Sequence, residues 1–144
     1  MATHNIAITY EPKIQGVKDG TIRQTIRLLN LNRPKKVGDT LYLFKWSGQP
    51  YRSKWLWKRK EIVKGISELQ VGQGCWAYWN EEDTASPEHF VSAVHPWDWE
   101  HFRIDEIAKA DGIDPPTGME LKAVLEKFHG SFAGEWRHFQ IIRW

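Results

Sequence analysis

Three polar side chains recur at every second position between residues 22 and 27, namely Arg23, Thr25 and Arg27. If this segment is a β-strand, all three share one face, because successive side chains of a strand point to opposite sides. The isoleucines between them can then be buried on the other face. Arginine offers a rigid fork of donors that fits phosphate or carboxylate. We therefore predict that this strand contacts an anionic ligand.

A second candidate surface is the segment 51–64, where cations and tryptophans are mixed most densely. In a strand, Trp55, Trp57 and Arg59 would face one way, and two indoles rimmed by cations can hold a stacked base. The alternative is that the indoles cover the core and the lysines coat the outside, as is common in a half-buried strand. The nucleic-acid-binding candidates in this segment are Arg52, Lys54, Trp55, Trp57 and Lys58.

The elements that must position these residues follow one another in irregular order. Apolar spacing predicts three helices and a larger number of short strands, joined at turns such as Gly38-Asp39. The strands are expected at 5–9, 22–27, 40–46, 75–79 and 135–144, with a hairpin partner after residue 51, and the helices at 10–18, 104–110 and 120–129. This order lacks the regular alternation of a parallel α/β sheet and favours an α+β class. A length of 144 residues predicts a single domain over 1–144.

Charge is unevenly distributed along the chain. Residues 1–75 contain 14 Lys and Arg against 5 Asp and Glu, a balance of +9, whereas residues 76–144 contain 6 against 13, a balance of −7. A basic half is typical of a protein that binds a polyanion, through release of counterions from phosphates. The alternative is a solvated basic surface that pairs with the acidic half in the fold.

Several classes of site are disfavoured by the sequence. Cys75 is the single cysteine, which excludes an internal disulfide and a Cys-based metal cluster, and we interpret it as a buried structural thiol. His95 and His101 lack metal-ligand spacing, and no phosphate loop or Gly-x-Ser-x-Gly motif is present, so we expect no metal and no cofactor. No apolar run approaches the roughly 20 residues that cross a bilayer, so we expect a soluble, cytoplasmic protein without a membrane partner.

The order of these motifs resembles the ASCH domain family of the PUA-like superfamily. The matching pieces are the helix at 10–17, the segment 20–27 in place of Gly-x-Lys-x-x-Thr-x-Arg, the Gly38-Asp39 turn, the segment 107–112, the helix at 120–129 and the strand at 139–144. The match brackets nearly the whole chain, with a looser fit over 45–101. It implies a small, mostly antiparallel PUA-like β-barrel with flanking helices.

The resemblance also implies a function, namely binding of RNA or of a modified nucleotide or nucleoside in a basic cleft. Some small ASCH proteins are amidohydrolases that act on acetylated cytidine, and another precedent is ribonuclease activity. Carried over, the family threonine falls on Thr25, the arginine on Arg27 and the acid on Asp111. The family lysine falls on Ile22, so Lys18 would have to supply the catalytic amine.

A third class of function uses the tryptophans differently. The chain has nine of them, most of which we expect to be structural because indoles are seldom left exposed. In a protein-interaction domain, the Trp97–Trp99 region and the acidic second half would form a docking face. The sequence leaves the oligomeric state open.

Overall fold

The computed structural model describes residues 1–72, 75–80, 91–94, 104–130 and 137–144. The first half contains β1 (Thr3–Ala7), α1 (Glu11–Asp19), β2 (Gln24–Leu28), β3 (Thr40–Trp46), β4 (Trp55–Ile62) and β5 (Gly65–Gly72). The second half contains β6 (Cys75–Asn80), β7 (Val91–Val94), α3 (Ile104–Ala110), α4 (Gly118–His129) and β8 (Arg137–Arg143). None of the helices in the described ranges is long and apolar enough to cross a membrane.

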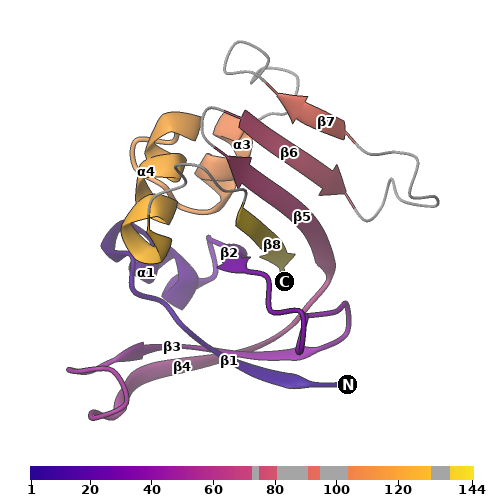
Figure 1. The fold of residues 1–144 in the computed structure, drawn as a ribbon. Coiled ribbons are helices and arrows are strands. Elements are labelled where there is room, and N and C mark those ends of the chain that lie inside the picture. The colour runs from indigo at the N-terminus through magenta and orange to yellow at the C-terminus, as the bar shows by residue number, and fades with distance from the viewer. Residues whose placement is uncertain (73–74, 81–90, 95–103, 131–136) are drawn as a thin grey trace.

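The described strands form two sheets, one of three strands in the order β1-β3-β4 and one of five in the order β2-β8-β5-β6-β7. Only β1 and β3 pair in parallel, and the other pairings among these strands are antiparallel. Figure 1 shows the helices gathered on one side of the five-stranded sheet, with the three-stranded sheet lying across its β2 end. The predicted α+β class is therefore confirmed, and the strand pairs belong to two separate sheets.

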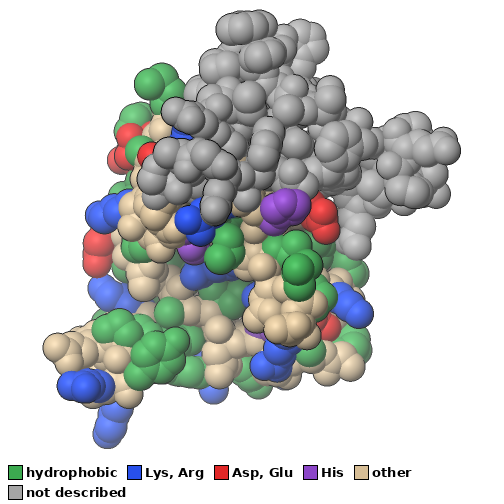
Figure 2. All heavy atoms as spheres, in the orientation of Figure 1, with side chains coloured by type: hydrophobic (Ala, Val, Ile, Leu, Met, Phe, Trp, Pro, Cys, Tyr) green, Lys and Arg blue, Asp and Glu red, His purple; other side chains and the backbone are tan. Residues whose placement is uncertain are grey.

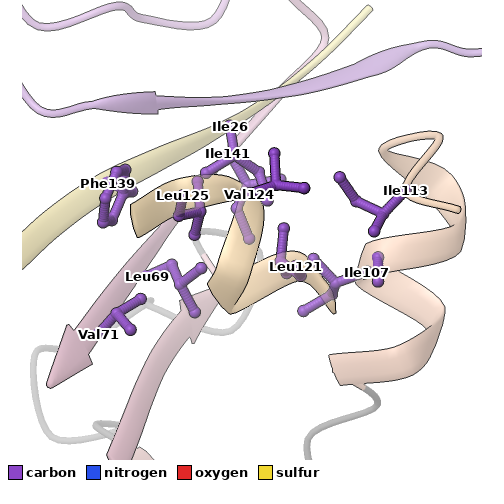
Figure 3. Close-up of a cluster of buried hydrophobic side chains, with 11 residues drawn as sticks. Ile26, Leu69, Val71, Ile107, Ile113, Leu121, Val124, Leu125, Phe139 and Ile141 are labelled. Carbon is purple, nitrogen blue, oxygen red and sulfur yellow. The ribbon is translucent and has the colours of Figure 1, made fainter. Parts of the chain in front are cut away.

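Two apolar clusters stabilise this arrangement. The first joins β2, β5 and β8 to α3 and α4, and Figure 3 shows Leu121 of α4 beside Ile107 of α3, with Leu125 on the side of Phe139 and Ile141 of β8. The second joins the three-stranded sheet to α1 through Ile14 and Val17. Burial of these side chains is the main favourable term in folding. The site described below lies where α1, β2 and α4 approach one another.

The helices begin and end as their sequences predict. Pro12 lies in the first turn of α1, and Gly20 ends the helix in the left-handed conformation (φ 86°) that glycine adopts without strain. Thr117 caps α4, where its side chain accepts a hydrogen bond from the Glu120 N–H at 3.1 Å. The predicted helices at 10–18, 104–110 and 120–129 are all present, with boundaries shifted by one or two residues at most.

The Gly38-Asp39 turn ties the amino terminus to β3. Asp39 is buried and accepts hydrogen bonds from the Ala2 N–H at 3.1 Å and the Lys36 N–H at 3.0 Å, and its Oδ2 lies 2.8 Å from His4 Nε2. These donors lower the pKa of Asp39, outweighing the burial that would raise it. The predicted turn is thus present, and its carboxylate organises the surrounding backbone.

Candidate functional site

A cavity of about 220 Å³ opens between the segment after β1, helix α1, strand β2, the turn after α3 and helix α4. Its polar lining comes from all five of these segments and consists mainly of Tyr10, Lys13, Thr25, Arg27, Asp111 and His129. The apolar part of the lining comes mainly from α4, through Leu121, Val124, Leu125 and Phe128. A concave site with an apolar wall and a few convergent polar groups is typical of a small-molecule pocket.

Lys13 and Asp111 form a buried ion pair at this cavity. Lys13 Nζ lies 3.0 Å from Asp111 Oδ1, and both side chains are less than a tenth exposed. Lys13 comes from α1 and shares its buried face with Ile14 and Val17. Asp111 follows α3, and its N–H donates to the Ile107 carbonyl. The pair therefore links α1 to the turn after α3 at the wall of the cavity.

Thr25 and Arg27 lie beside this pair on β2. The Arg27 Nε–H donates to Thr25 Oγ1 at 3.2 Å, and Arg27 Nη2 donates to the Ala7 carbonyl at 2.6 Å. Because the Thr25 oxygen accepts from Arg27, its hydroxyl proton is available to donate to another acceptor. No ion pair of Arg27 is found among the described residues. Its positive charge is therefore available to attract a negatively charged group in the cavity.

Ile22, which stands where the resembled family has lysine, has a packing role. A methyl group on Gly112 would lie 2.5 Å from Ile22 Cδ1, and one on Gly16 would contact the same atom. The Ile22 side chain thus fills the space between α1 and the turn that carries Asp111. Gly112 has a φ of 79°, so glycine is favoured there on conformational grounds as well. This close packing holds Lys13 against Asp111.

Burial changes the protonation behaviour of the pair. It lowers the pKa of the Lys13 ammonium, and the attraction of Asp111 offsets only part of this change. It also raises the pKa of the Asp111 carboxyl, and the charge of Lys13 offsets only part of that change. Both changes favour uncharged forms, because a buried charge loses its hydration. The pair is therefore suited to moving a proton between an amine and a carboxyl group.

Two further groups support the polar wall. Gln24 donates from Nε2 to the Ile107 carbonyl at 3.1 Å, and its side chain also hydrogen-bonds toward Asp111. His129 ends α4 and packs its ring against Phe139, with centroids 5.3 Å apart. Burial lowers the pKa of His129, and the charges of Arg27 and Arg137 lower it further. An uncharged imidazole therefore faces the cavity near neutral pH.

The structure brings together only part of the predicted site. Thr25, Arg27 and Asp111 all line the cavity. Arg23 does not, because β2 begins after it, and its exposed side chain donates from Nε to the Gly20 carbonyl. Lys18 is exposed in the last turn of α1 and does not line the cavity, where Lys13 of the same helix supplies the amine group instead.

Lys13 was missed by sequence reasoning, although a signal for it exists. It lies four residues before Val17 and next to Ile14, so it falls on the apolar stripe of α1. A lysine on such a stripe is either buried with a partner or extends its charge to the surface. His129 was also missed, since it was interpreted only as the end of a helix.

The predicted nucleic-acid-binding residues of the β3–β4 hairpin lie outside the cavity. Trp55 and Trp57 do not form one platform, because the pairing shifts register between Lys45 and Trp46 and leaves Leu56 unpaired. Trp57 packs against the second apolar cluster, whereas Trp55 stacks on Phe44. Arg52, Lys54 and Lys58 are exposed.

Other expectations fall on parts of the chain that the structure leaves undescribed. The Trp97–Trp99 region, His95 and His101 lie outside the described residues, and the side chain of Cys75 is likewise not described. Within the described ranges, no group of three His, Cys, Asp or Glu side chains is placed to hold a metal ion. Comparisons with family models, curated protein sequences and solved structures gave no match to this chain.

Proposed function

We propose that the chain is an ASCH-type hydrolase that binds an N-acylated nucleoside, such as acetylated cytidine, in the cavity and cleaves its amide bond. The observation that carries this proposal is the contact of Lys13 Nζ with Asp111 Oδ1, 3.0 Å apart beside Thr25 and Arg27. Lys13 reaches the site from α1 and supplies the amine that Ile22 cannot. The missing motif lysine therefore does not argue against hydrolysis.

The proposal includes a PUA-like architecture. It is supported by the order of the elements and by the Gly38-Asp39 turn before β3. The Lys64 N–H also donates to the Arg143 carbonyl at 2.8 Å, which joins the link between β4 and β5 to the end of β8. In this view the two sheets are the halves of a small, opened barrel.

The chemistry of the step follows from the protonation of the pair. Uncharged Lys13 accepts a proton from a water molecule as the water oxygen attacks the acyl carbon, while the Thr25 hydroxyl donates a hydrogen bond to the acyl oxygen. The C–N bond then breaks, and protonated Asp111 gives its proton to the leaving nitrogen. Transfer of a proton from Lys13 back to Asp111, across their contact, restores the starting state. The products are a carboxylic acid and the free amino group of the nucleoside.

The lining of the cavity supports a nucleoside ligand. A volume of about 220 Å³ is below the ~300–1,000 Å³ of typical ligand pockets, which limits the ligand to a small molecule. The apolar side chains of α4 can contact the flat face of a base or an acyl group, while the polar wall contacts the amide. The phenol of Tyr10, which accepts from the Asp114 N–H at 3.2 Å, lies at the same cavity.

Formation of cytidine from N4-acetylcytidine at neutral pH, followed by liquid chromatography, tests the proposal directly. Lys13→Met and Asp111→Asn should each lower turnover by at least about 100-fold, because each removes a proton-transfer group. Lys18→Met and Asp114→Asn are matched controls, since both residues are exposed neighbours of the same elements. They should retain full turnover.

The same experiment separates hydrolysis from binding without turnover, the second candidate for this cavity. That candidate is favoured by the positive charge of Arg27, which suits a nucleotide. Calorimetric binding of cytidine or its monophosphate, lost in Lys13→Met and unaccompanied by product formation, would replace the hydrolase with a nucleotide-binding module. Absence of both binding and turnover would reject the cavity as a nucleoside site.

A further inference from the structure

The outer face of the β3–β4 hairpin, which bears Tyr42, carries a cluster of four contacting aromatic rings, formed by Trp46, Tyr51, Trp55 and the buried Phe44. Phe44 and Trp55 are stacked, with ring centroids 4.0 Å apart and planes 17° from parallel. Trp46 meets both rings edge-on and lies 5.4 Å from the ring of Tyr51. Because of the register shift at Leu56, Trp55 pairs with Trp46 and joins this hairpin aromatic cluster, whereas Trp57 pairs with Lys45 on the other face.

Much of the hairpin end is open to solvent. Tyr51 is 91% exposed and adopts a φ of 62°, a left-handed conformation that is uncommon for a tyrosine. Leu56, the unpaired residue of the bulge, is 62% exposed. Contiguous patches of exposed apolar side chains are typical of interaction sites. Figure 2 shows hydrophobic and cationic side chains over this end of the hairpin, at the lower left.

The charge of the hairpin has one sign. Residues 40–60 contain six Lys and Arg and no Asp or Glu. Two of the six, Lys45 and Arg59, pair with Glu11 and Glu61. The ion pairs found among the described residues involve none of the four exposed cations, which are Arg52, Lys54, Lys58 and Lys60.

The cations and the rings are close enough to act on one ligand. Lys58 Nζ lies 4.8 Å from the centroid of the Tyr42 ring and 5.8 Å from that of Trp55. A polyanion would be attracted by the four cations, and only a polyanion with flat rings would also use the aromatic cluster. Anionic lipids and acidic peptides match the charge alone.

We propose that the outer face of the β3–β4 hairpin binds a single-stranded nucleic acid. Its bases stack on Tyr51, Trp46 and Trp55, and its phosphates contact the four exposed cations. Trp57 and Arg59 are excluded from this surface, because they face α1 and the second apolar cluster. The surface is distinct from the cavity, and the proposal does not depend on hydrolysis there.

Fluorescence anisotropy with a labelled 12-nucleotide oligouridine or oligothymidine at increasing salt tests this surface. Release of counterions by about four contacted phosphates predicts a slope of log K against log salt near −3, at about −0.7 per phosphate of a single strand. The double variant Lys54→Glu/Lys58→Glu should weaken binding by more than tenfold. Tyr51→Ala should weaken it about tenfold through loss of stacking, with little change in the salt slope.

Two controls make the result specific. Lys109→Glu/Lys127→Glu makes the same change of net charge at exposed positions of α3 and α4 and should change affinity no more than about twofold. Lys13→Met should leave oligonucleotide binding unchanged even where it abolishes turnover, so failure of this proposal is distinguishable from failure of the hydrolase. Equal binding of oligouridine, polyglutamate and anionic vesicles, or an unchanged affinity of Tyr51→Ala, would overturn the proposal.

Discussion

The Lys13–Asp111 pair and the His4–Asp39 pair are equally buried and similarly close, yet their carboxylates are held in different ways. Asp39 is contacted by two backbone N–H groups and by the His4 ring, within a turn that the chain needs in order to enter β3. Asp111 contacts one flexible ammonium group and a glutamine side chain, and it lies at the wall of a cavity. The Asp39 carboxylate therefore fixes the backbone of a turn, whereas the Asp111 carboxyl lines a cavity.

The pKa directions follow from that difference. Three hydrogen bonds outweigh burial at Asp39 and lower its pKa, whereas burial dominates at Asp111 and raises its pKa. A carboxylate that folding has stabilised in its charged form contributes to stability. A pair held near neutrality contributes little to stability and is available for proton transfer. Burial of an ion pair therefore does not indicate its role, but the donors around its carboxylate do.

Replacing both members of each pair should give the largest difference in the free energy of unfolding between the Lys13–Asp111 pair and the His4–Asp39 pair. Lys13→Met alone should lower the free energy of unfolding by about 2 kcal/mol at pH 7, because it leaves the buried Asp111 carboxyl group without its hydrogen-bond partner. The double variant Lys13→Met/Asp111→Leu should recover most of that loss, because two apolar side chains can fill the same space. Urea unfolding of the variants measures both values.

The corresponding variant of the other pair supplies the contrast. His4→Phe/Asp39→Leu should remain destabilised by about 2 kcal/mol or more, because the Ala2 and Lys36 N–H groups lose their acceptor. Turnover in the cavity should survive in the remaining folded protein. If both double variants lose equal stability, the distinction between a structural and a functional pair is wrong.

The glycines beside the two carboxylates allow a second, smaller test. Gly38 precedes Asp39 with a φ of 92°, and Gly112 follows Asp111 with a φ of 79°. Alanine at Gly38 meets only the flexible Met1 side chain, so Gly38→Ala should cost about 1 kcal/mol for the strained backbone. Gly112→Ala also meets Ile22, so it should cost about 2 kcal/mol.

The effect on turnover distinguishes these glycines further. Gly112→Ala should displace Asp111 from Lys13 and lower cytidine formation, whereas Gly38→Ala should change stability alone. Unfolding by urea and the cytidine assay, run on the same preparations, give both quantities. Equal loss of turnover in the two variants would show that packing around Ile22 does not position the site.

Much of the fold and half of the site were predictable from local patterns. The alternation of Arg23, Thr25 and Arg27 predicted a shared face, and two of the three do line the cavity. The segment 65–72 was not expected as a strand, although β5 pairs with both β6 and β8. Its strand character depends on partners far along the chain, which local propensity does not report.

The errors at the site have the same origin. Lys13 becomes a site residue only when α1 packs near a turn 98 residues later, and Ile22 fills the space that fixes this contact. The separation of Trp55 from Trp57 depends on a register shift against β3, which alternation within β4 alone does not predict. Tertiary packing decided both outcomes.

Acid titration of stability gives the smallest effect and opposite signs for the two carboxylates. Asp39 has a lowered pKa, so its contribution is complete above the ordinary value of 3.8 and is lost as the pH falls through the folded value. The stability difference between wild type and Asp39→Asn should therefore be constant from pH 7 to about pH 5 and shrink below pH 4. Asp111 has a raised pKa, so the folded chain binds its proton more tightly than the unfolded chain does.

The wild type should accordingly gain stability relative to Asp111→Asn as the pH falls from neutrality toward 4, and Lys13, whose lowered pKa acts with the opposite sign, is present in both chains. A difference of one in pKa between the folded and unfolded chains corresponds to about 1.4 kcal/mol, so urea unfolding at half-unit steps of pH resolves both trends. Parallel curves for the two comparisons would mean that the donors around each carboxylate do not set its protonation. Diverging curves would mean that the cavity favours the protonated form of the Asp111 carboxyl, whereas the turn favours the charged form of Asp39.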